Sequence, residues 1–159
     1  MVKCIYILIF VFITSFLNAQ GCKEQFVSDS LYKPAEKTKV AVSLININLK
    51  NGGNIQLINN NGKYVLKLAL NEKFGFLETG SLEIKSGGKS FFIKNTTLYD
   101  IKEPTSYFLV DILINYVATL KDDGITSVVF NGKFEAKIAK EDVTQIKKAA
   151  KCFYELHRK

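Results

Sequence analysis

His157 is the only imidazole in the chain, so a Ser-His-Asp or Cys-His active site would have to use it. It lies in a terminal Leu-His-Arg-Lys run, where chain ends usually fray. Cys152 stands five residues earlier, about 140° around a helix, so the two side chains would diverge. We therefore assign no catalytic residue and expect a protein that is not an enzyme.

Two other motifs look like ligand sites and fail on spacing. Gly88-Lys89-Ser90 ends like a phosphate-binding loop, but Glu83 occupies the required first glycine position and a strand-like segment follows. Asp122-Asp123-Gly124 resembles part of a calcium loop without its third acidic position or closing Glu. One His and two distant cysteines make a weak zinc set. We expect no metal and no cofactor.

The first nineteen residues are typical of a secretory signal peptide. Lys3 precedes an apolar run from Cys4 to Leu17, which is too short to span a membrane as a helix. Cleavage after Ala19 would leave a periplasmic or secreted protein with no membrane span. Ala19-Gln20-Gly21-Cys22 also resembles a lipobox, and lipidation of Cys22 would instead give an outer-membrane lipoprotein with a lipid anchor.

Signal cleavage would remove Cys4 and leave two cysteines in an oxidising compartment. The even pair predicts a disulfide between Cys22 and Cys152, closing a loop of about 130 residues. The chain-entropy model assigns such a loop about 4–5 kcal/mol. Lipidation would consume Cys22, so the disulfide and the lipid anchor exclude each other.

The chain is basic, with 22 Lys and Arg against 15 Asp and Glu in 159 residues. Arg158 is the only arginine, although base reading and bidentate phosphate recognition rely on arginine. The lysines are dispersed among apolar positions, which is typical of a solvated basic surface. We expect no nucleic-acid partner.

Residues 20–39 are polar and without clear periodicity, which predicts an N-terminal arm. Within it, Asp29-Ser30-Leu31 resembles the O-glycosylation acceptor of exported Bacteroidota proteins, with Ser30 as the acceptor. Residues 40–159 then form one domain.

Period-2 alternation dominates residues 40–110 and predicts strands. The alternation slips between Leu44 and Ile45, which predicts a β-bulge there, with Asn46 and Asn48 opposite the apolar positions that follow. Hairpin turns are indicated at Asn60-Asn61-Gly62, Gly87-Gly88 and Asn131-Gly132, because Asn and Gly tolerate positive φ.

Helical spacing appears twice. Asp111 is a candidate N-cap for a short helix near residues 111–122, with Gly124 beyond its end. An apolar stripe that includes Val143, Ile146, Ala150, Phe153 and Leu156 predicts a C-terminal helix near 141–157. The fold class is therefore α+β: a mostly antiparallel, sandwich-like sheet covered by two helices.

The order of elements from Ser106 onward, with the Leu-x-Leu strands and Asn-Gly turns before it, is similar to small exported proteins of Bacteroidota, periplasmic or lipoprotein-like. The resemblance implies fold and compartment and carries no functional residue. We expect a non-catalytic binding domain for an envelope protein, such as an inhibitor or immunity-type protein. The alternative is a carrier of a small apolar ligand, with a cleft lined by phenylalanines: Phe74, Phe76, Phe91, Phe92, Phe108 and Phe130.

Overall fold

The computed structural model describes residues 25–28, 41–72, 79–102 and 105–158, and the elements below lie within these ranges. The strands are β1 (Gln25–Ser28), β2 (Ala41–Asn48), β3 (Asn54–Asn60), β4 (Lys63–Leu70), β5 (Thr79–Ser86), β6 (Lys89–Lys102), β7 (Thr105–Ile112), β8 (Ser127–Phe130) and β9 (Phe134–Lys137). The helices are α2 (Ile114–Asp123) and α3 (Lys140–His157). The predicted class, α+β and mostly β, is confirmed.

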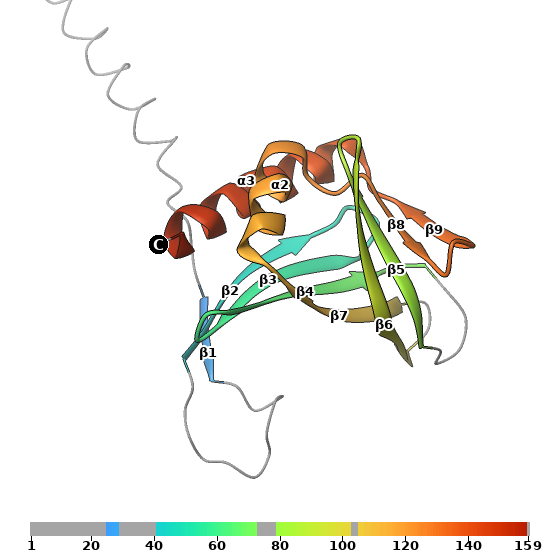
Figure 1. Cartoon of the computed structure of the whole chain (residues 1–159), viewed down its shortest axis with the longest axis horizontal. Helices are drawn as coiled ribbons and strands as arrows, with labels where there is room; N and C mark the ends of the chain where they lie inside the picture. The colour runs from blue at the N-terminus through green and yellow to red at the C-terminus, as the bar shows by residue number, and fades with distance from the viewer. Residues whose placement is uncertain (1–24, 29–40, 73–78, 103–104, 159) are drawn as a thin grey trace, which may run out of the picture.

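The described strands form one antiparallel sheet in the order β1-β2-β3-β4-β7-β6-β5-β8-β9. The long strand β6 joins its two halves, since residues 89–97 pair with β5 and residues 98–102 pair with β7. The sheet is strongly curved, and both helices lie on one side of its β2-β3-β4-β7 half (Figure 1). We call the opposite side of that half the outer face.

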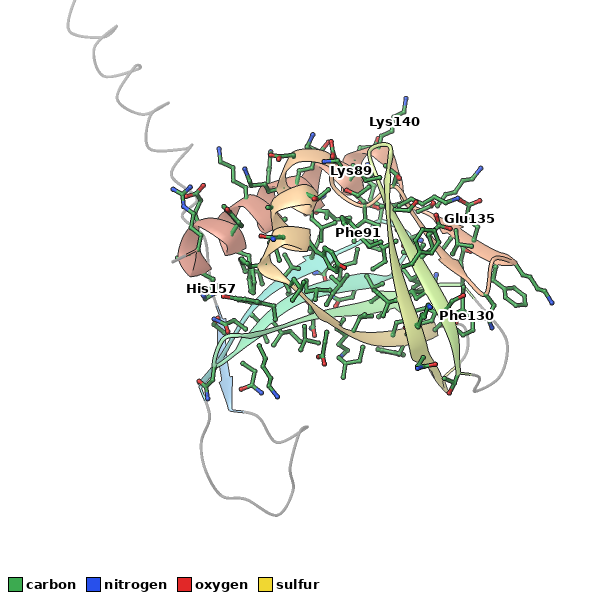
Figure 2. All side chains as sticks on the ribbon, in the orientation of Figure 1. Lys89, Phe91, Phe130, Glu135, Lys140 and His157 are labelled. Carbon is green, nitrogen blue, oxygen red and sulfur yellow. The ribbon has the colours of Figure 1, made fainter. Side chains whose placement is uncertain are left out.

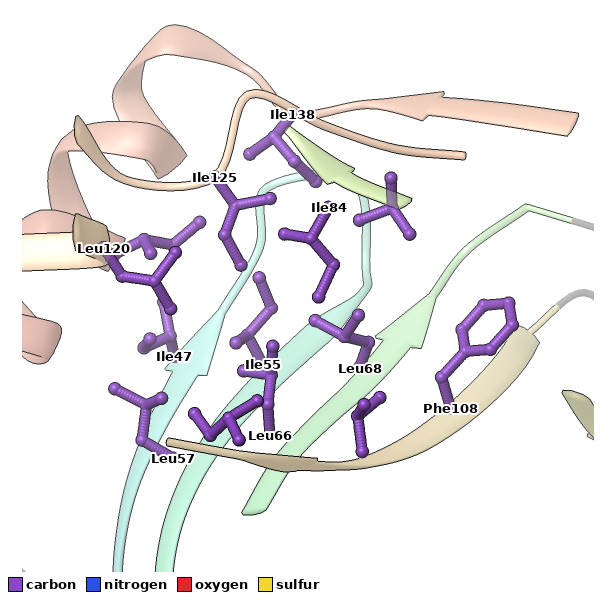
Figure 3. Close-up of a cluster of buried hydrophobic side chains, with 14 of the residues drawn as sticks. Ile47, Ile55, Leu57, Leu66, Leu68, Ile84, Phe108, Leu120, Ile125 and Ile138 are labelled. Atoms are coloured by element: carbon purple, nitrogen blue, oxygen red, sulfur yellow. The ribbon is translucent and has the colours of Figure 1, made fainter. Parts of the chain in front are cut away.

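The hydrophobic core lies between the sheet and the two helices. Alternate strand residues point inward and are almost completely buried, among them Ile55, Leu68 and Phe108 (Figure 3). They meet Val117 and Leu120 from α2 and Ile146, Ala150 and Phe153 from α3. The inward side chains of the strands and the apolar stripe of α3 therefore pack against each other.

All three predicted hairpin turns are present. Asn61 and Gly62 have φ of 50° and 85°, and Asn131 and Gly132 have φ of 51° and 66°. Positive φ at both central residues is the geometry that matches the twist of adjoining strands. Gly87 and Gly88 join β5 to β6, so the phosphate-loop lookalike at residues 88–90 is a hairpin that leads into a strand.

The predicted bulge at Leu44-Ile45 is wrong. β2 pairs with β3 without a shift, from Ser43 opposite Asn59 to Asn48 opposite Asn54. The pattern slips because Ser43 is the inward residue, 6% exposed, while Leu44 points outward opposite Ile58. The described ladders shift instead between Gly80 and Leu82 and between Asp100 and Lys102.

The N-cap prediction at Asp111 is also wrong. Asp111 and Ile112 continue β7, opposite Val65 and Tyr64 of β4. Helix α2 therefore starts at Ile114, after Leu113, without a side-chain cap. Strand pairing extended two residues further than the apolar pattern suggested. The predicted start of α3 is one residue late, since the helix runs from Lys140.

Part of the predicted N-terminal arm forms a strand, because Gln25–Ser28 pair with β2 as β1. The signal peptide, Cys22 and Ser30 lie outside the described residues. Of the helices in the described ranges, neither is both long and apolar enough to cross a membrane.

Candidate functional site

His157 lies in the last turn of α3, which brings it against β2 and β3 (Figure 2). Its Nε2 lies 3.2 Å from the Oγ of Ser43, and its Nδ1 lies 2.9 Å from the Nδ2 of Asn59. Its ring also meets the edge of Phe153, with centroids 4.6 Å apart. The helix end that the sequence suggested would fray is therefore held, and the three polar residues resemble a Ser-His-Asn triad.

The direction of the hydrogen bonds argues against that triad acting chemically. The backbone N–H of Gly62 donates to Oδ1 of Asn59, which turns the amide NH₂ of Asn59 toward His157. The neutral tautomer that matches this amide orientation accepts at Nδ1 from Asn59 and donates from Nε2 to Ser43. A histidine that donates to a serine hydroxyl cannot remove its proton. We interpret this cluster as a lock that fixes α3 to the sheet.

Asp142 is a buried charged residue that the sequence analysis missed. It is 2% exposed in the first turn of α3, and its two carboxylate oxygens accept from the backbone N–H of Lys50, at 3.3 and 3.2 Å. The bond ties the turn after β2 to the start of α3. In the sequence, Asp142 is an acidic residue directly before the apolar stripe of the helix. Acidic residues are common in the first turn of any helix, so its burial was not evident.

The apolar notch beside α2 is small. It has a cavity volume of about 10 Å³ and is lined by core side chains and by Phe91, Ile93 and Tyr116. That volume admits about one water molecule. Among the phenylalanines proposed to line a ligand cleft, Phe108 and Phe130 are buried in the core, while Phe92 is 68% exposed. Phe74 and Phe76 lie outside the described residues.

The acidic calcium-loop lookalike is the end of α2. Asp122 pairs with Lys121 at 3.3 Å, and Gly124 adopts a φ of 71° as the helix C-cap. Asp123 packs against Gly87 of the β5–β6 hairpin. Within the described ranges, His, Cys, Asp and Glu form no group that could hold a metal ion.

The outer face carries a cluster of side-chain amides on β2 and β3, which we call the amide cluster: Asn46, Asn48, Asn54 and Gln56. These residues occupy outward positions, because Ile47 and Ile55 beside them are buried. Oδ1 of Asn46 accepts from Asn54 at 2.6 Å and from Gln56 at 3.0 Å. Oδ1 of Asn48 accepts from Asn46 and Asn54, each at 3.1 Å.

The outer face continues across β4 and β7 with different side chains. Asn54 lies opposite Ala69, which lies opposite Tyr107, so a small residue separates the amide cluster from a tyrosine. Ala69 is 5% exposed and Tyr107 is half-buried. In the next row, Lys67 holds its Nζ 5.5 Å from the centroid of the Tyr107 ring. Tyr107 is thus the aromatic edge of the amide-rich surface.

Part of the hydrogen-bonding capacity of the amide cluster is unused within the described structure. Oδ1 of Asn54, Oε1 of Gln56 and the NH₂ of Asn48 take part in none of its hydrogen bonds. The outer face therefore offers two acceptors and a donor within one connected network. The sequence signal was the run of amides on the polar phase of the alternation, which marks strand positions as well as a polar surface.

The predicted site residues are described only in part. Cys152 is half-buried on α3 and packs against the core. Its predicted partner Cys22 lies outside the described residues, so the disulfide, lipidation of Cys22 and glycosylation of Ser30 stay predictions.

The comparisons with known proteins give no relative. No protein-family model, no curated protein and no solved structure matches this chain.

Proposed function

We propose that this protein is an exported, non-catalytic binding domain of the cell envelope that engages its partner through the outer face. The observation that carries the proposal is the amide cluster, whose unused donors and acceptors stand beside Tyr107 on a sheet face that neither described helix covers. Convergent polar groups and an aromatic ring are the usual elements of a recognition surface.

The scaffold beneath this surface is well packed. The same strands that present the amide cluster outward bury Ile47, Ile55 and Leu57 inward, each 4% exposed or less. The lock at His157 and the bond of Asp142 fix α3 over these strands. Side chains held on a packed sheet lose little entropy on binding, which favours a preformed site.

A retention assay on envelope material tests the proposal. The purified protein is immobilised and exposed to solubilised envelope extract, and bound protein and carbohydrate are both measured. We expect Asn54→Ala/Gln56→Ala to lose the retained component, while Gln145→Ala, an exposed amide on α3, retains it. Equal retention by the double variant would exclude the outer face as the binding surface.

We also propose that export joins Cys22 to Cys152. Phe26 of β1 lies opposite Ser43, and Ser43 contacts His157, five residues after Cys152 on α3. The four steps of extended chain from Cys22 to Phe26 reach about 13 Å, and five helical residues span about 7.5 Å. The chain is therefore long enough to bring the two cysteines together.

The intact mass of the natively exported protein separates the two fates of Cys22. A mass two hydrogens below that of the reduced chain after Ala19, returning on reduction, supports the disulfide. A mass raised by a diacylglycerol and an acyl chain would establish the lipoprotein form and exclude the disulfide.

A further inference from the structure

We propose that the ligand of the outer face is a neutral, hydroxyl-rich glycan. The inference rests on the proposed function, because it names the chemical class that the amide cluster would bind.

The amide cluster offers both hydrogen-bond donors and acceptors, which is what sugar hydroxyls bind. Amides are uncharged and present an acceptor and a donor close together. Here the acceptors belong to Asn54 and Gln56 and the donor to Asn48, and each of the three is hydrogen-bonded to Asn46. A sugar hydroxyl both donates and accepts, so adjacent hydroxyls on one ring can satisfy both kinds of group. The pre-existing hydrogen bonds hold the amides in place before the ligand arrives.

An aromatic side chain, Tyr107, stands beside the amide cluster. Tyr107 is separated from Asn54 by Ala69, whose short side chain leaves the Tyr107 ring and the amide as the taller neighbours. Sugar rings carry C–H groups on one side and hydroxyls at the edge, so one ring could meet the tyrosine with its apolar side and the amides with its hydroxyls. Lys67 reaches the Tyr107 ring by a long flexible chain, which can move aside.

The outer face carries few charged side chains. The outward positions of β2 from Leu44 and of β3 hold only apolar and amide side chains. On β4 and β7, Lys63 and Lys67 are accompanied by Asp111. A phosphate polymer needs several clustered cations, because counterion release supplies most of its affinity. The outer face therefore favours an uncharged polymer over a nucleic acid.

The apolar side chains of the outer face lie beside the amide cluster. Leu44 and Ile58, both half-buried, form a row with Val65, which is 5% exposed, and Leu109 is 40% exposed on β7. Protein interfaces centre on a desolvated apolar or aromatic cluster. Since amides and Tyr107 stand where such a centre would lie, the cluster fits a hydrated glycan better than a protein.

Native affinity electrophoresis tests the inference with three defined probes cast into the gel: a soluble β-1,3-glucan, a galactomannan and glycogen. We expect at least one of them to retard the purified protein. Asn54→Ala/Gln56→Ala should weaken the interaction about tenfold, since two neutral hydrogen bonds are lost, and Gln145→Ala should leave it unchanged. The side-chain amide signals of Asn48, Asn54 and Gln56 should shift on titration with the same probe in NMR spectra.

Absence of retardation by all three polysaccharides, or equal retardation of the double variant, would overturn the inference. If the unaltered chain retains a protein from the envelope extract and the double variant does not, the outer face is a binding surface for another class of ligand. If it loses nothing in either assay, the proposed function is wrong as well.

Discussion

Asp142 offers the sharpest test of how the fold is held together. Its carboxylate is 2% exposed and both oxygens accept from the N–H of Lys50. Asp142→Ala would remove the acceptor and leave that N–H without its partner, and Asp142→Asn would keep the shape and one acceptor oxygen while removing the charge.

The magnitude follows from the contacts. A hydrogen bond to a charged group contributes about 1.5–3 kcal/mol. An acidic side chain in the first turn of a helix adds about 0.3–1 kcal/mol through the helix dipole, and α3 has no side-chain cap at Ala139 to replace it. We therefore expect Asp142→Ala to lower the free energy of unfolding by about 2–4 kcal/mol, and Asp142→Asn by about 1 kcal/mol.

Urea denaturation of the three proteins measures these differences, with equal slopes showing that only stability has changed. Glu141→Ala is the matched control, because Glu141 shares the first turn of α3 with Asp142 but is exposed, and its ion pair with Lys50, at 3.7 Å, is exposed as well. We expect the control to lose clearly less stability than Asp142→Ala, because it loses the first-turn charge but no buried hydrogen bond. An Asp142→Ala protein as stable as the control would refute the role assigned to the buried carboxylate.

Three further outcomes follow from the structure. Ser86 is fully buried with no hydrogen-bond partner for its hydroxyl in the described residues, so Ser86→Ala should raise the free energy of unfolding by up to about 1 kcal/mol in urea melts; a loss of stability would contradict this. Gly87→Ala should lower the thermal midpoint more than Gly62→Ala, because both have positive φ but only a Cβ at Gly87 meets another side chain, at 2.5 Å; equal losses would show that φ alone decides. A hydrogen bond from Ser127, followed by one from Lys85, lowers the pKa of Glu135, so its stabilisation is present above the unfolded pKa and is lost as pH falls through the folded pKa. NMR titration should show that Ser127→Ala raises the pKa of Glu135, and an unchanged value would remove Ser127 as the main cause.

Local chemistry made the hairpin turns readable from the sequence. Asn61-Gly62 and Asn131-Gly132 specify their hairpins because the required φ is a property of those residues themselves. The buried stripe of α3 was readable for the same reason, since helical spacing alone brings Ile146, Ala150 and Phe153 to one side.

Distant partners explain what the sequence did not predict. Ser43 broke the apolar alternation because its inward position meets His157, 114 residues away, and the pattern therefore suggested a bulge. Asp111 is of a residue type that often caps a helix, but its pairing with Val65 keeps it in β7. In both cases a residue type that usually marks a local feature was used for a contact that only the folded chain creates.

The polar residues on β2 and β3 fall into two groups with different surroundings. Ser43 and Asn59 lie opposite each other on the inner side, where His157 satisfies them. Asn54 and Gln56 occupy the alternate phase, where their remaining acceptors face outward without a partner in the described structure. In the sequence both groups are merely polar residues within strands rich in apolar side chains. Pleating divides them into a group that fastens the helix and a group left open to a ligand, so the candidate site became visible only once the pairing of the strands was known.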